Sequence, residues 1–465
     1  PASWQGRRVH FVGIGGSGMS GIAKIALARG AHVSGSDLHH SSVLESLKAA
    51  GVAISVPHNP SNIEGMDPKR DLVVRSSAVP EKNSELIAAH EGGIPIWERA
   101  HFLAELMAGY RSVAVAGTHG KTTTTSMATV ALQHCRLDPS FAIGAAVRNS
   151  GTNAHHGTGD IFVVEADESD GSFTAYKPDG AIITNIELDH VDNFKDLESI
   201  DKAFQDFIRS IASQGFLVAC IDDPGVIRAL EFAKKNRSDI TITTYGESKD
   251  ADLVIDRIFL EPRSAKARFT LRGRVLGEIE LAIPGQHNIL NSAAALLAGI
   301  ELGAPAGELI AGLALFTGAR RRFEIKAVSQ GITVVDDYGH HPTEIRATLE
   351  TARNFAGAGR VIAIFQPHRF TRTQAFASEF ALELSRADLT YLLEVYPASE
   401  KPIPGITSLS ISSKMDSEKV IYQPSMPEVI ASVVAQAKPG DVIITLGAGD
   451  VSSLGPLIAA NLSEV

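Results

Sequence analysis

Residues 116–123 (AGTHGKTT) combine glycines, a lysine and threonines within one predicted turn, between an apolar run and a helical pattern. At such a turn backbone amides hold phosphate oxygens, the lysine places a positive charge near β and γ phosphates, and a threonine hydroxyl binds Mg²⁺. The spacing departs from the usual P-loop, because Val115 stands where the first glycine would be. We predict that Lys121 and Thr122 serve the phosphates of ATP and Mg²⁺.

Acidic residues follow the next two apolar runs. Residues 165–168 (EADE) and 187–190 (ELDH) each come directly after such a run. Parallel neighbouring strands end at the same edge of a sheet, so we expect both clusters to lie near Lys121. Magnesium takes oxygen ligands and keeps waters, which suits this composition. The candidate metal ligands are Thr122, Glu168 and, as a less usual one, His190.

An earlier glycine loop, residues 13–19 (GIGGSGM), fits G-x-G-x-x-G through Gly13, Gly15 and Gly18. Glycine permits a tight turn and a close approach to phosphate, and the helix that follows offers its positive end to a diphosphate. Asp37 ends the next apolar run, where an acidic side chain can accept hydrogen bonds from ribose hydroxyls. NAD, FAD and a UDP-sugar would all satisfy this pattern, so these residues alone leave the diphosphate open.

The two glycine loops together narrow the chemistry. A simple dehydrogenase has no use for the lysine-containing loop, and a simple ATPase has no use for the earlier one. An enzyme that uses ATP to act on a second, nucleotide-linked substrate needs both loops.

Further charged residues gather at the ends of predicted strands in the last third of the chain. Residues 336–344 (DDYGHHPTE) and 366–373 (QPHRFTRT) each end a strand and open a helix. Arginines at such a place indicate recognition of a carboxylate or a phosphate. Residues 318–324 (GARRRFE) concentrate cations just before this segment.

The elements that must position these residues alternate between strands and helices along the chain. This alternation predicts an α/β fold with mostly parallel sheets, whose ligands collect at the carboxyl ends of strands. The stretch 265–283 differs, because apolar residues alternate with Arg and Thr as in a half-buried antiparallel strand. Composition and pattern place domain boundaries near 108–111 and 315–323.

The composition is that of an ordinary globular protein, with 44% hydrophobic and 21% charged residues among 465. A net charge of −10 argues against sequence-independent binding to nucleic acid or to anionic membranes. The two cysteines, Cys135 and Cys220, exclude a disulfide scaffold and a four-cysteine zinc site. With no apolar stretch long enough to cross a bilayer, we expect a cytoplasmic protein, monomeric or homodimeric, without membrane insertion or a nucleic-acid partner.

Six segments together resemble the Mur ligases, ATP-dependent bacterial enzymes that add amino acids to a UDP-linked muramic acid. The segments are 116–125 (AGTHGKTTTT), 165–170 (EADESD), 184–190 (TNIELDH), 284–291 (PGQHNILN), 321–324 (RRFE) and 336–344 (DDYGHHPTE). Within that family, residues 13–19 and 365–373 (FQPHRFTRT) resemble the members that join L-alanine to UDP-N-acetylmuramate. The resemblance runs from about residue 9 to Gly449 in the expected order.

The resemblance implies three domains: a Rossmann-like domain at 1–108 for the UDP substrate, a central P-loop ATPase-like α/β domain at 109–317 for ATP, and a Rossmann-like domain at 318–465 that binds the amino acid and closes the site. It implies ATP and Mg²⁺ as cofactors, with UDP-N-acetylmuramate and L-alanine as substrates. Several relatives carry a carbamylated lysine near a second metal; we find no equivalent here and predict none.

Residue roles also follow from the resemblance. The ATP-binding set is Gly117, Thr118, His119, Gly120, Lys121, Thr122, Thr123, His287, Asn288, Asn291, Arg322 and Asp337. The UDP-substrate set is Gly15, Gly16, Ser17, Gly18, Met19, Asp37, Ser76, His119, Thr152, Asn153 and Tyr338. The metal set is Thr122, Glu168 and His190, and the catalytic set is Lys121, His341, Arg369 and Arg372, with His341 the candidate for deprotonating the incoming ammonium.

The implied route is phosphorylation of the muramyl lactyl carboxylate, attack of the amine on the acyl phosphate, and collapse of a tetrahedral intermediate to amide and phosphate. One alternative is the related ligase that attaches a preformed tripeptide to the same sugar nucleotide, since it shares the ATP motifs. An NAD-dependent oxidoreductase would explain residues 13–37 but leaves Lys121 without a role. A nucleotide-gated binding protein without ligase chemistry is a further alternative.

Overall fold

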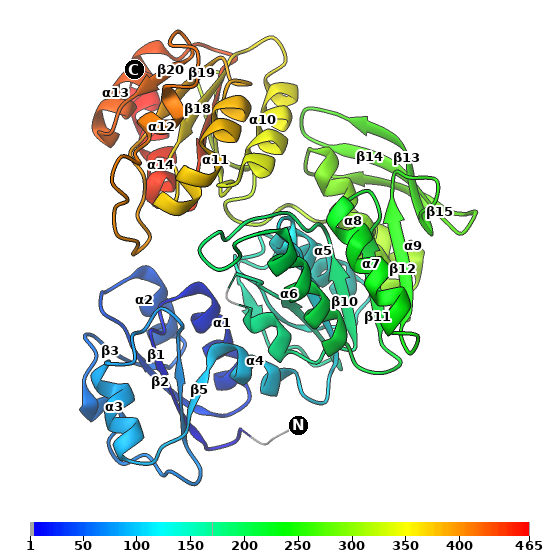
Figure 1. The fold of residues 1–465 in the computed structure, drawn as a ribbon, viewed down its shortest axis with the longest axis vertical. Helices are drawn as coiled ribbons and strands as arrows, with labels where there is room; N and C mark the ends of the chain where they lie inside the picture. The colour runs from blue at the N-terminus through cyan, green and yellow to red at the C-terminus, as the bar shows by residue number, and fades with distance from the viewer. Residues whose placement is uncertain (1–3, 170, 465) are drawn as a thin grey trace.

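A computed structural model describes residues 4–169 and 171–464 of the chain. They form three α/β domains, each built around its own sheet (Figure 1). The N-terminal and C-terminal domains lie toward opposite ends of the longest axis, and the central domain lies beside both (Figure 1). The α/β class with three domains is therefore confirmed. Asp170, the last residue of the motif at 165–170, lies outside the described residues.

The N-terminal domain has a parallel five-stranded sheet in the order β3-β2-β1-β4-β5. Its strands are β1 (Arg8–Val12), β2 (His32–Ser36), β3 (Ala53–Ser55), β4 (Leu72–Arg75) and β5 (Ile96–Glu98). Its helices are α1 (Ser17–Ala28), α2 (Ser42–Ala49), α3 (Ser84–Glu91) and α4 (Arg99–Met107), with a 3₁₀ turn at Pro60–Ile63. The chain leaves β1 toward one side of the sheet and later returns to the other, so the glycine loop after β1 lies where the strand order reverses, the usual ligand position in such sheets.

The central domain has a ten-stranded sheet in the order β15-β14-β13-β12-β11-β10-β6-β9-β7-β8. Its first strands are β6 (Arg111–Ala116), β7 (Ser140–Ala142), β8 (Ala154–His155), β9 (Ile161–Glu165) and β10 (Gly180–Ile183). They are followed by β11 (Phe216–Cys220), β12 (Thr241–Gly246), β13 (Leu253–Leu260), β14 (Ala265–Leu271) and β15 (Arg274–Leu281). The helices are α5 (Lys121–His134), α6 (Leu197–Ser210), α7 (Pro224–Asn236), α8 (Gln286–Glu301) and α9 (Ala306–Ala314), with a 3₁₀ turn at Ser172–Ala175.

The register of the central sheet explains why distant motifs meet. Strand β6 pairs in parallel with β9 on one side and β10 on the other, so the segments that follow all three strands share one edge. The expectation that both acidic clusters flank the P-loop strand is confirmed. Strands β13, β14 and β15 are antiparallel, which confirms the prediction for 265–283.

The C-terminal domain has a six-stranded sheet in the order β16-β17-β21-β18-β19-β20, parallel except for β16. Its strands are β16 (Glu324–Ser329), β17 (Ile332–Asp337), β18 (Val361–Phe365), β19 (Leu389–Leu392), β20 (Val420–Tyr422) and β21 (Val442–Leu446). Its helices are α10 (Pro342–Ala356), α11 (Phe370–Leu384), α12 (Leu409–Ser412), α13 (Met426–Gln436) and α14 (Leu454–Glu464), with a 3₁₀ turn at Asp450–Ser453.

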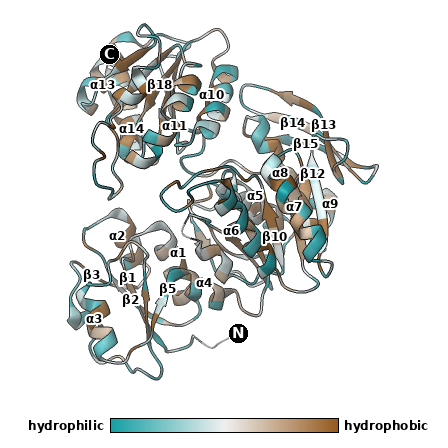
Figure 2. Ribbon diagram, in the orientation of Figure 1, coloured by the Kyte–Doolittle hydropathy of each residue, from teal (hydrophilic) through white to brown (hydrophobic). Residues whose placement is uncertain are grey.

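The two outer domains join the central one through different surfaces. One continuous apolar cluster runs from Phe11 and Phe102 in the N-terminal domain to Phe162 and Phe204 in the central domain. The C-terminal domain instead keeps two apolar clusters of its own. Colouring by hydropathy places the apolar residues mainly on the strands, with polar residues on outward helix faces (Figure 2). Within residues 4–169 and 171–464, no helix is both long and apolar enough to span a membrane.

Candidate active site

The turn after β6 is close-packed, and two of its glycines have positive φ angles. A Cβ on Gly117, whose φ is +136°, would lie 2.0 Å from the Thr184 hydroxyl, so only glycine fits there. Gly120 caps α5 with φ +83°, and the first residue of that helix is Lys121. The Lys121 ammonium donates to the carbonyl oxygens of Gly117 and Thr118 at 2.7 and 3.1 Å, so it folds back across the turn.

Lys121 is surrounded by more carboxylates than it can neutralise. Its ammonium donates to both oxygens of the fully buried Glu168, at 2.8 and 3.0 Å. Burial opposes the charge on Lys121, but Glu168 and Asp167 outweigh it and raise the pKa of the lysine. Burial, with a further contribution from Asp167, raises the pKa of Glu168 to about 7 although Lys121 acts in the opposite direction. This edge of the sheet therefore holds an excess of buried negative charge.

Part of the predicted metal set lies together. Ligand atoms of Asp167, Glu168 and His190 all lie within 4.8 Å of one another, and the donor set of two carboxylates and an imidazole suits a divalent cation. The third predicted ligand, Thr122, donates to Glu165 at 2.9 Å. Asp167 and Glu165 belong to the motif predicted at this edge, but neither was among the predicted ligands.

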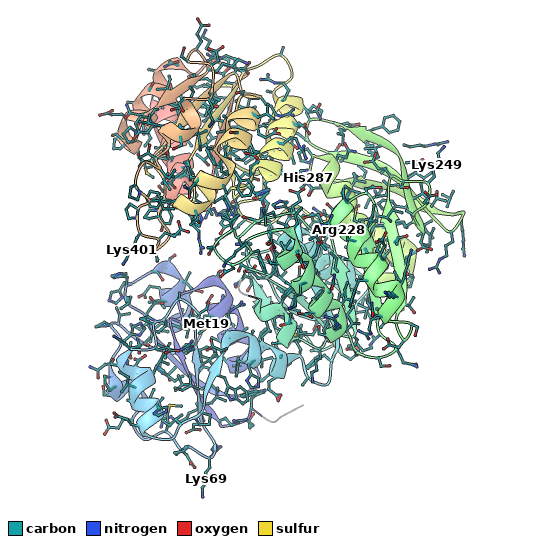
Figure 3. All side chains as sticks on the ribbon, in the orientation of Figure 1. Met19, Lys69, Arg228, Lys249, His287 and Lys401 are labelled. Carbon is teal, nitrogen blue, oxygen red and sulfur yellow. The ribbon has the colours of Figure 1, made fainter. Side chains whose placement is uncertain are left out.

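The predicted ATP residues gather from two domains around one cavity of about 200 Å³. Its lining includes His119, Gly120, Thr123, His287, Asn288, Asn291, Arg322 and Asp337. His287 lies where the C-terminal domain faces the central one (Figure 3). Burial, with the nearby Arg322, lowers the pKa of His287 to about 4, so the imidazole is neutral at pH 7. Gly117 and Thr118 lie in the adjoining turn, and Lys121 and Thr122 begin α5.

Cys220 and Tyr245 are among the lining residues of this cavity that were not predicted. Cys220 ends β11 and Tyr245 lies in β12, and both line the cavity. Burial raises the pKa of the Cys220 thiol to about 12, so it acts as a small neutral surface. No motif marks either residue, and only their positions at strand ends could have indicated them.

His119 connects the P-loop turn to the C-terminal domain. Its two ring nitrogens lie 3.6 Å from Glu187 and 3.4 Å from Glu344. Burial disfavours the charged ring, but these two carboxylates outweigh burial and raise the pKa of His119 to about 9. The ring of His341 lies 4.7 Å from that of His119. Burial and the charge on His119 lower the pKa of His341 to about 4, so His341 is a neutral imidazole at pH 7.

The earlier glycine loop lines a second pocket, which opens onto the central domain. Gly16, Ser17, Gly18, Met19 and Ser76 share this pocket with Gly144, Glu165 and Asp167. Arg99, the first residue of α4, also lines it and packs against Gly18, where a Cβ would lie 3.2 Å from its guanidinium. Sequence reasoning missed Arg99, because it follows β5 and lies far from the loop in the sequence. The pocket connects the diphosphate-type loop with the acidic edge beside Lys121.

Four predicted substrate residues hold local structure. Asp37 accepts a hydrogen bond from the Gly15 amide at 2.8 Å and so fixes the loop from the next strand. Asn153 donates to the Ser17 carbonyl at 2.9 Å, which ties the central domain to the loop. Thr152 donates to the Ala154 carbonyl at 2.9 Å. The guanidinium carbon of Arg321 lies over the ring of Tyr338, 4.8 Å from the centre of that ring. Their roles toward substrate stay predictions.

The two arginines of the catalytic set face the central domain. Arg372 donates through Nε and Nη2 to Oδ1 of Asp189 at 2.9 and 2.7 Å. Arg369 forms an ion pair with Asp192. Burial tends to raise the pKa of Asp189, but Arg372 outweighs it and lowers that pKa far below its ordinary value. The motif at 187–190 thus reaches the C-terminal domain as well as the metal cluster.

Three family models cover most of the chain. The Mur ligase family catalytic domain matches residues 8–111, the Mur ligase middle domain matches 115–299, and the Mur ligase glutamate ligase domain matches 321–449. The chain is 48% identical over 462 residues to a UDP-N-acetylmuramate–L-alanine ligase of Saccharopolyspora erythraea, covering 98% of this chain and 94% of the relative. It is 46% identical over 455 residues to the ligase of the same description in Paenarthrobacter aurescens, covering 98% and 97%.

Solved structures agree with these matches. A UDP-N-acetylmuramate–alanine ligase from Thermotoga maritima superposes with a TM-score of 0.81 at 28% identity, covering 98% of this chain and 99% of that one. A murein peptide ligase from Psychrobacter arcticus superposes with a TM-score of 0.72 at 25% identity, covering 99% of each chain.

Proposed function

The chain belongs to the Mur ligase family, and on that basis we propose that it joins L-alanine to the lactyl carboxylate of UDP-N-acetylmuramate, with cleavage of ATP to ADP and phosphate. This reaction makes a precursor of peptidoglycan. Curated relatives 44–48% identical over nearly the whole chain carry this activity in their names, which favours it over the tripeptide alternative. An oxidoreductase leaves the lysine-containing loop without a role.

One observation carries the proposal beyond family membership. The pocket of the earlier glycine loop is also lined by Glu165, which ends β9, and by Asp167, two residues later, both near Lys121. A UDP-sugar held by its diphosphate at Ser17 and Arg99 can therefore extend its acid toward the phosphates of ATP. We assign the UDP substrate to residues 1–108, ATP to 109–317 and the amino acid to 318–465.

Phosphoryl transfer from ATP to the lactyl carboxylate requires two anions to approach each other. Lys121 neutralises part of this charge, and the amides of the turn at 117–120 hold the phosphate oxygens. Thr122, Asp167, Glu168 and His190 would hold Mg²⁺, with Glu165 positioning the Thr122 hydroxyl. Bound Mg²⁺ supplies charge neutralisation at the transferred phosphoryl group.

The acyl phosphate then reacts with the neutral amine of L-alanine. His341, the residue before α10, faces Glu187 of the central domain and is a neutral imidazole at pH 7. A pKa of about 4 makes it a weak base, and its Nδ1 accepts a hydrogen bond from the Thr343 amide, so its part in deprotonating the ammonium stays a prediction. Arg369 provides a cation for the carboxylate of the amino acid, whereas Arg372 stays paired with Asp189 and positions α11 against the central domain. The C-terminal domain covers the nucleotide cavity with Arg322 and Asp337, which limits access of water to the acyl phosphate.

Phosphate release tests the proposal directly. The protein is given ATP, Mg²⁺ and UDP-N-acetylmuramate, and then L-alanine, glycine, L-serine or the murein tripeptide. We expect release that requires both the sugar nucleotide and L-alanine, with ¹⁸O from the lactyl carboxylate in the released phosphate. Tripeptide as the better acceptor would favour the alternative ligase, and unlabelled phosphate would exclude the acyl phosphate. Cytoplasmic location and a monomeric or homodimeric state stay predictions.

A further inference from the structure

Two ion pairs join the C-terminal domain to the loop after β10. Arg372 in α11 donates twice to Asp189, and Arg369, the residue before α11, pairs with Asp192. Both arginines belong to the set assigned to substrate carboxylates. In the structure, each of these arginines is instead paired with a carboxylate of the protein itself.

The two pairs differ in burial. The side chains of Arg372 and Asp189 are 4% and 3% exposed, whereas those of Arg369 and Asp192 are 32% and 27% exposed. Breaking a buried, doubly hydrogen-bonded pair leaves uncompensated charge in a region of low polarity. An exposed pair contributes little, because water solvates both partners once they separate. A small carboxylate from solution can therefore displace Asp192 but not Asp189.

The backbone of Arg369 is held in place by its surroundings, whereas the carboxylate paired with its guanidinium can be replaced. Its φ of +71° is rare for a residue other than glycine, and its amide donates to the Tyr396 carbonyl at 2.8 Å. Glu400 lies 4.0 Å from the guanidinium, but its carboxylate already accepts hydrogen bonds from the amide and hydroxyl of Thr371. Asp192 is therefore the carboxylate that an incoming ligand replaces.

We propose that Asp192 competes with the amino-acid substrate for Arg369. The α-carboxylate of the amino acid takes the place of the Asp192 carboxylate, so the link between Asp192 and the C-terminal domain opens as this substrate enters. Asp192 thereby weakens amino-acid binding and keeps Arg369 neutralised until the substrate arrives, while Arg372 stays paired with Asp189. The inference rests on the proposed ligase function.

The test measures KM and kcat for L-alanine in Asp192→Asn. Removing the competing charge should lower KM for L-alanine about threefold to fivefold, as expected for an exposed ion pair, with kcat changed less than twofold. Asp192→Glu keeps the charge and should return KM toward the wild-type value. An unchanged KM in Asp192→Asn would overturn the proposal, because Asp192 would then not compete with the substrate for Arg369. A raised KM would also overturn it, because Asp192 would then be needed to position Arg369 for the substrate.

Two controls isolate competition for the carboxylate. L-Alaninamide has no carboxylate, so its KM should be the same in wild type and in Asp192→Asn; an equal decrease for both compounds contradicts the proposal. Asp201→Asn breaks another exposed pair of the central domain, with Arg228, and should leave KM for L-alanine unchanged. If Asp192→Asn does not fold, Asp192→Ser removes the same charge and is judged by the same KM. Wild-type protein without turnover of L-alanine would refute the proposed function itself.

Discussion

Two buried glutamates, Glu85 in the N-terminal domain and Glu168 in the central domain, are both fully buried but have opposite surroundings. Glu85 accepts hydrogen bonds from the Ser36 hydroxyl, the Asn62 amide group and the backbone amide of Asn59. Burial alone would raise its pKa, but these donors and His10 outweigh burial and lower the pKa to about 2. Glu168 shares Lys121 with Asp167, and its pKa is raised to about 7.

This difference separates a structural carboxylate from a functional one. Every oxygen of Glu85 has a donor, so this carboxylate is fully paired and stabilises the fold. The acids beside Lys121 exceed their cations, and such imbalance is typical of a site that binds a further cation or changes its charge during a reaction. The predictions below test this contrast, from the largest expected effect to the smallest.

Glu168→Gln should lower the rate of phosphate release by roughly 10²- to 10³-fold, the range found when one preorganised electrostatic contact to a transition state is removed. The free energy of unfolding should stay equal or increase, because the substitution removes one negative charge from a buried cluster that holds an excess of them. Steady-state assays with L-alanine give the rate, and urea titration gives the free energy of unfolding. Lys121→Ala should show a loss of similar or larger size. Activity of Glu168→Gln within tenfold of wild type would contradict the assignment.

Glu85→Gln should destabilise the N-terminal domain by up to about 3 kcal/mol at pH 7, the free energy that corresponds to the lowered pKa. A lowered pKa stabilises the fold above its ordinary value of 4.5, and this contribution is lost as the pH falls toward 2. The difference between wild type and variant should therefore be full at pH 7 and shrink below about pH 5.

Tryptophan fluorescence measures this effect selectively, because both tryptophans of the chain, Trp4 and Trp97, lie in the N-terminal domain. Urea titrations followed by fluorescence at pH 7 and pH 4 give the two differences. Glu91→Gln, an exposed glutamate of the same helix, serves as the control and should have little effect. A difference that does not depend on pH would mean that Glu85 acts through packing and not through its charge.

Arg99→Gln should raise KM for UDP-N-acetylmuramate about tenfold and leave kcat within threefold, because a charge-assisted hydrogen bond contributes about 1.5 kcal/mol or more to binding. KM for ATP should not change. The experiment compares initial rates over a range of sugar-nucleotide concentrations, with Arg70→Gln, a cation elsewhere in the same domain, as control. An unaltered KM would remove Arg99 from the diphosphate pocket.

Sequence reasoning predicted the class of the fold, but it could not predict the partners of individual charged side chains. The alternation of apolar runs and helical patterns predicted the α/β class, and the alternation within 265–283 predicted antiparallel strand structure, since both depend on local periodicity. That this stretch forms two strands, β14 and β15, was not predicted. The motif at 165–168 predicted acids near Lys121, but not that Glu165 would be the one bonded to Thr122. Arg99, Cys220 and Tyr245 carry no motif, because nothing in their sequence neighbours records which cavity they line.

The sequence by itself determined the local units: two glycine turns that begin helices, a lysine at the first position of α5, and acids directly after strands. These follow from backbone conformations that neighbouring residues impose. Only the tertiary structure decided the pairings across long separations, such as Arg372 with Asp189, 183 residues apart. Such pairs depend on how whole domains pack and on which strands lie side by side. Packing also determines which ion pair is buried and therefore stable, and which is exposed so that a ligand can replace one partner.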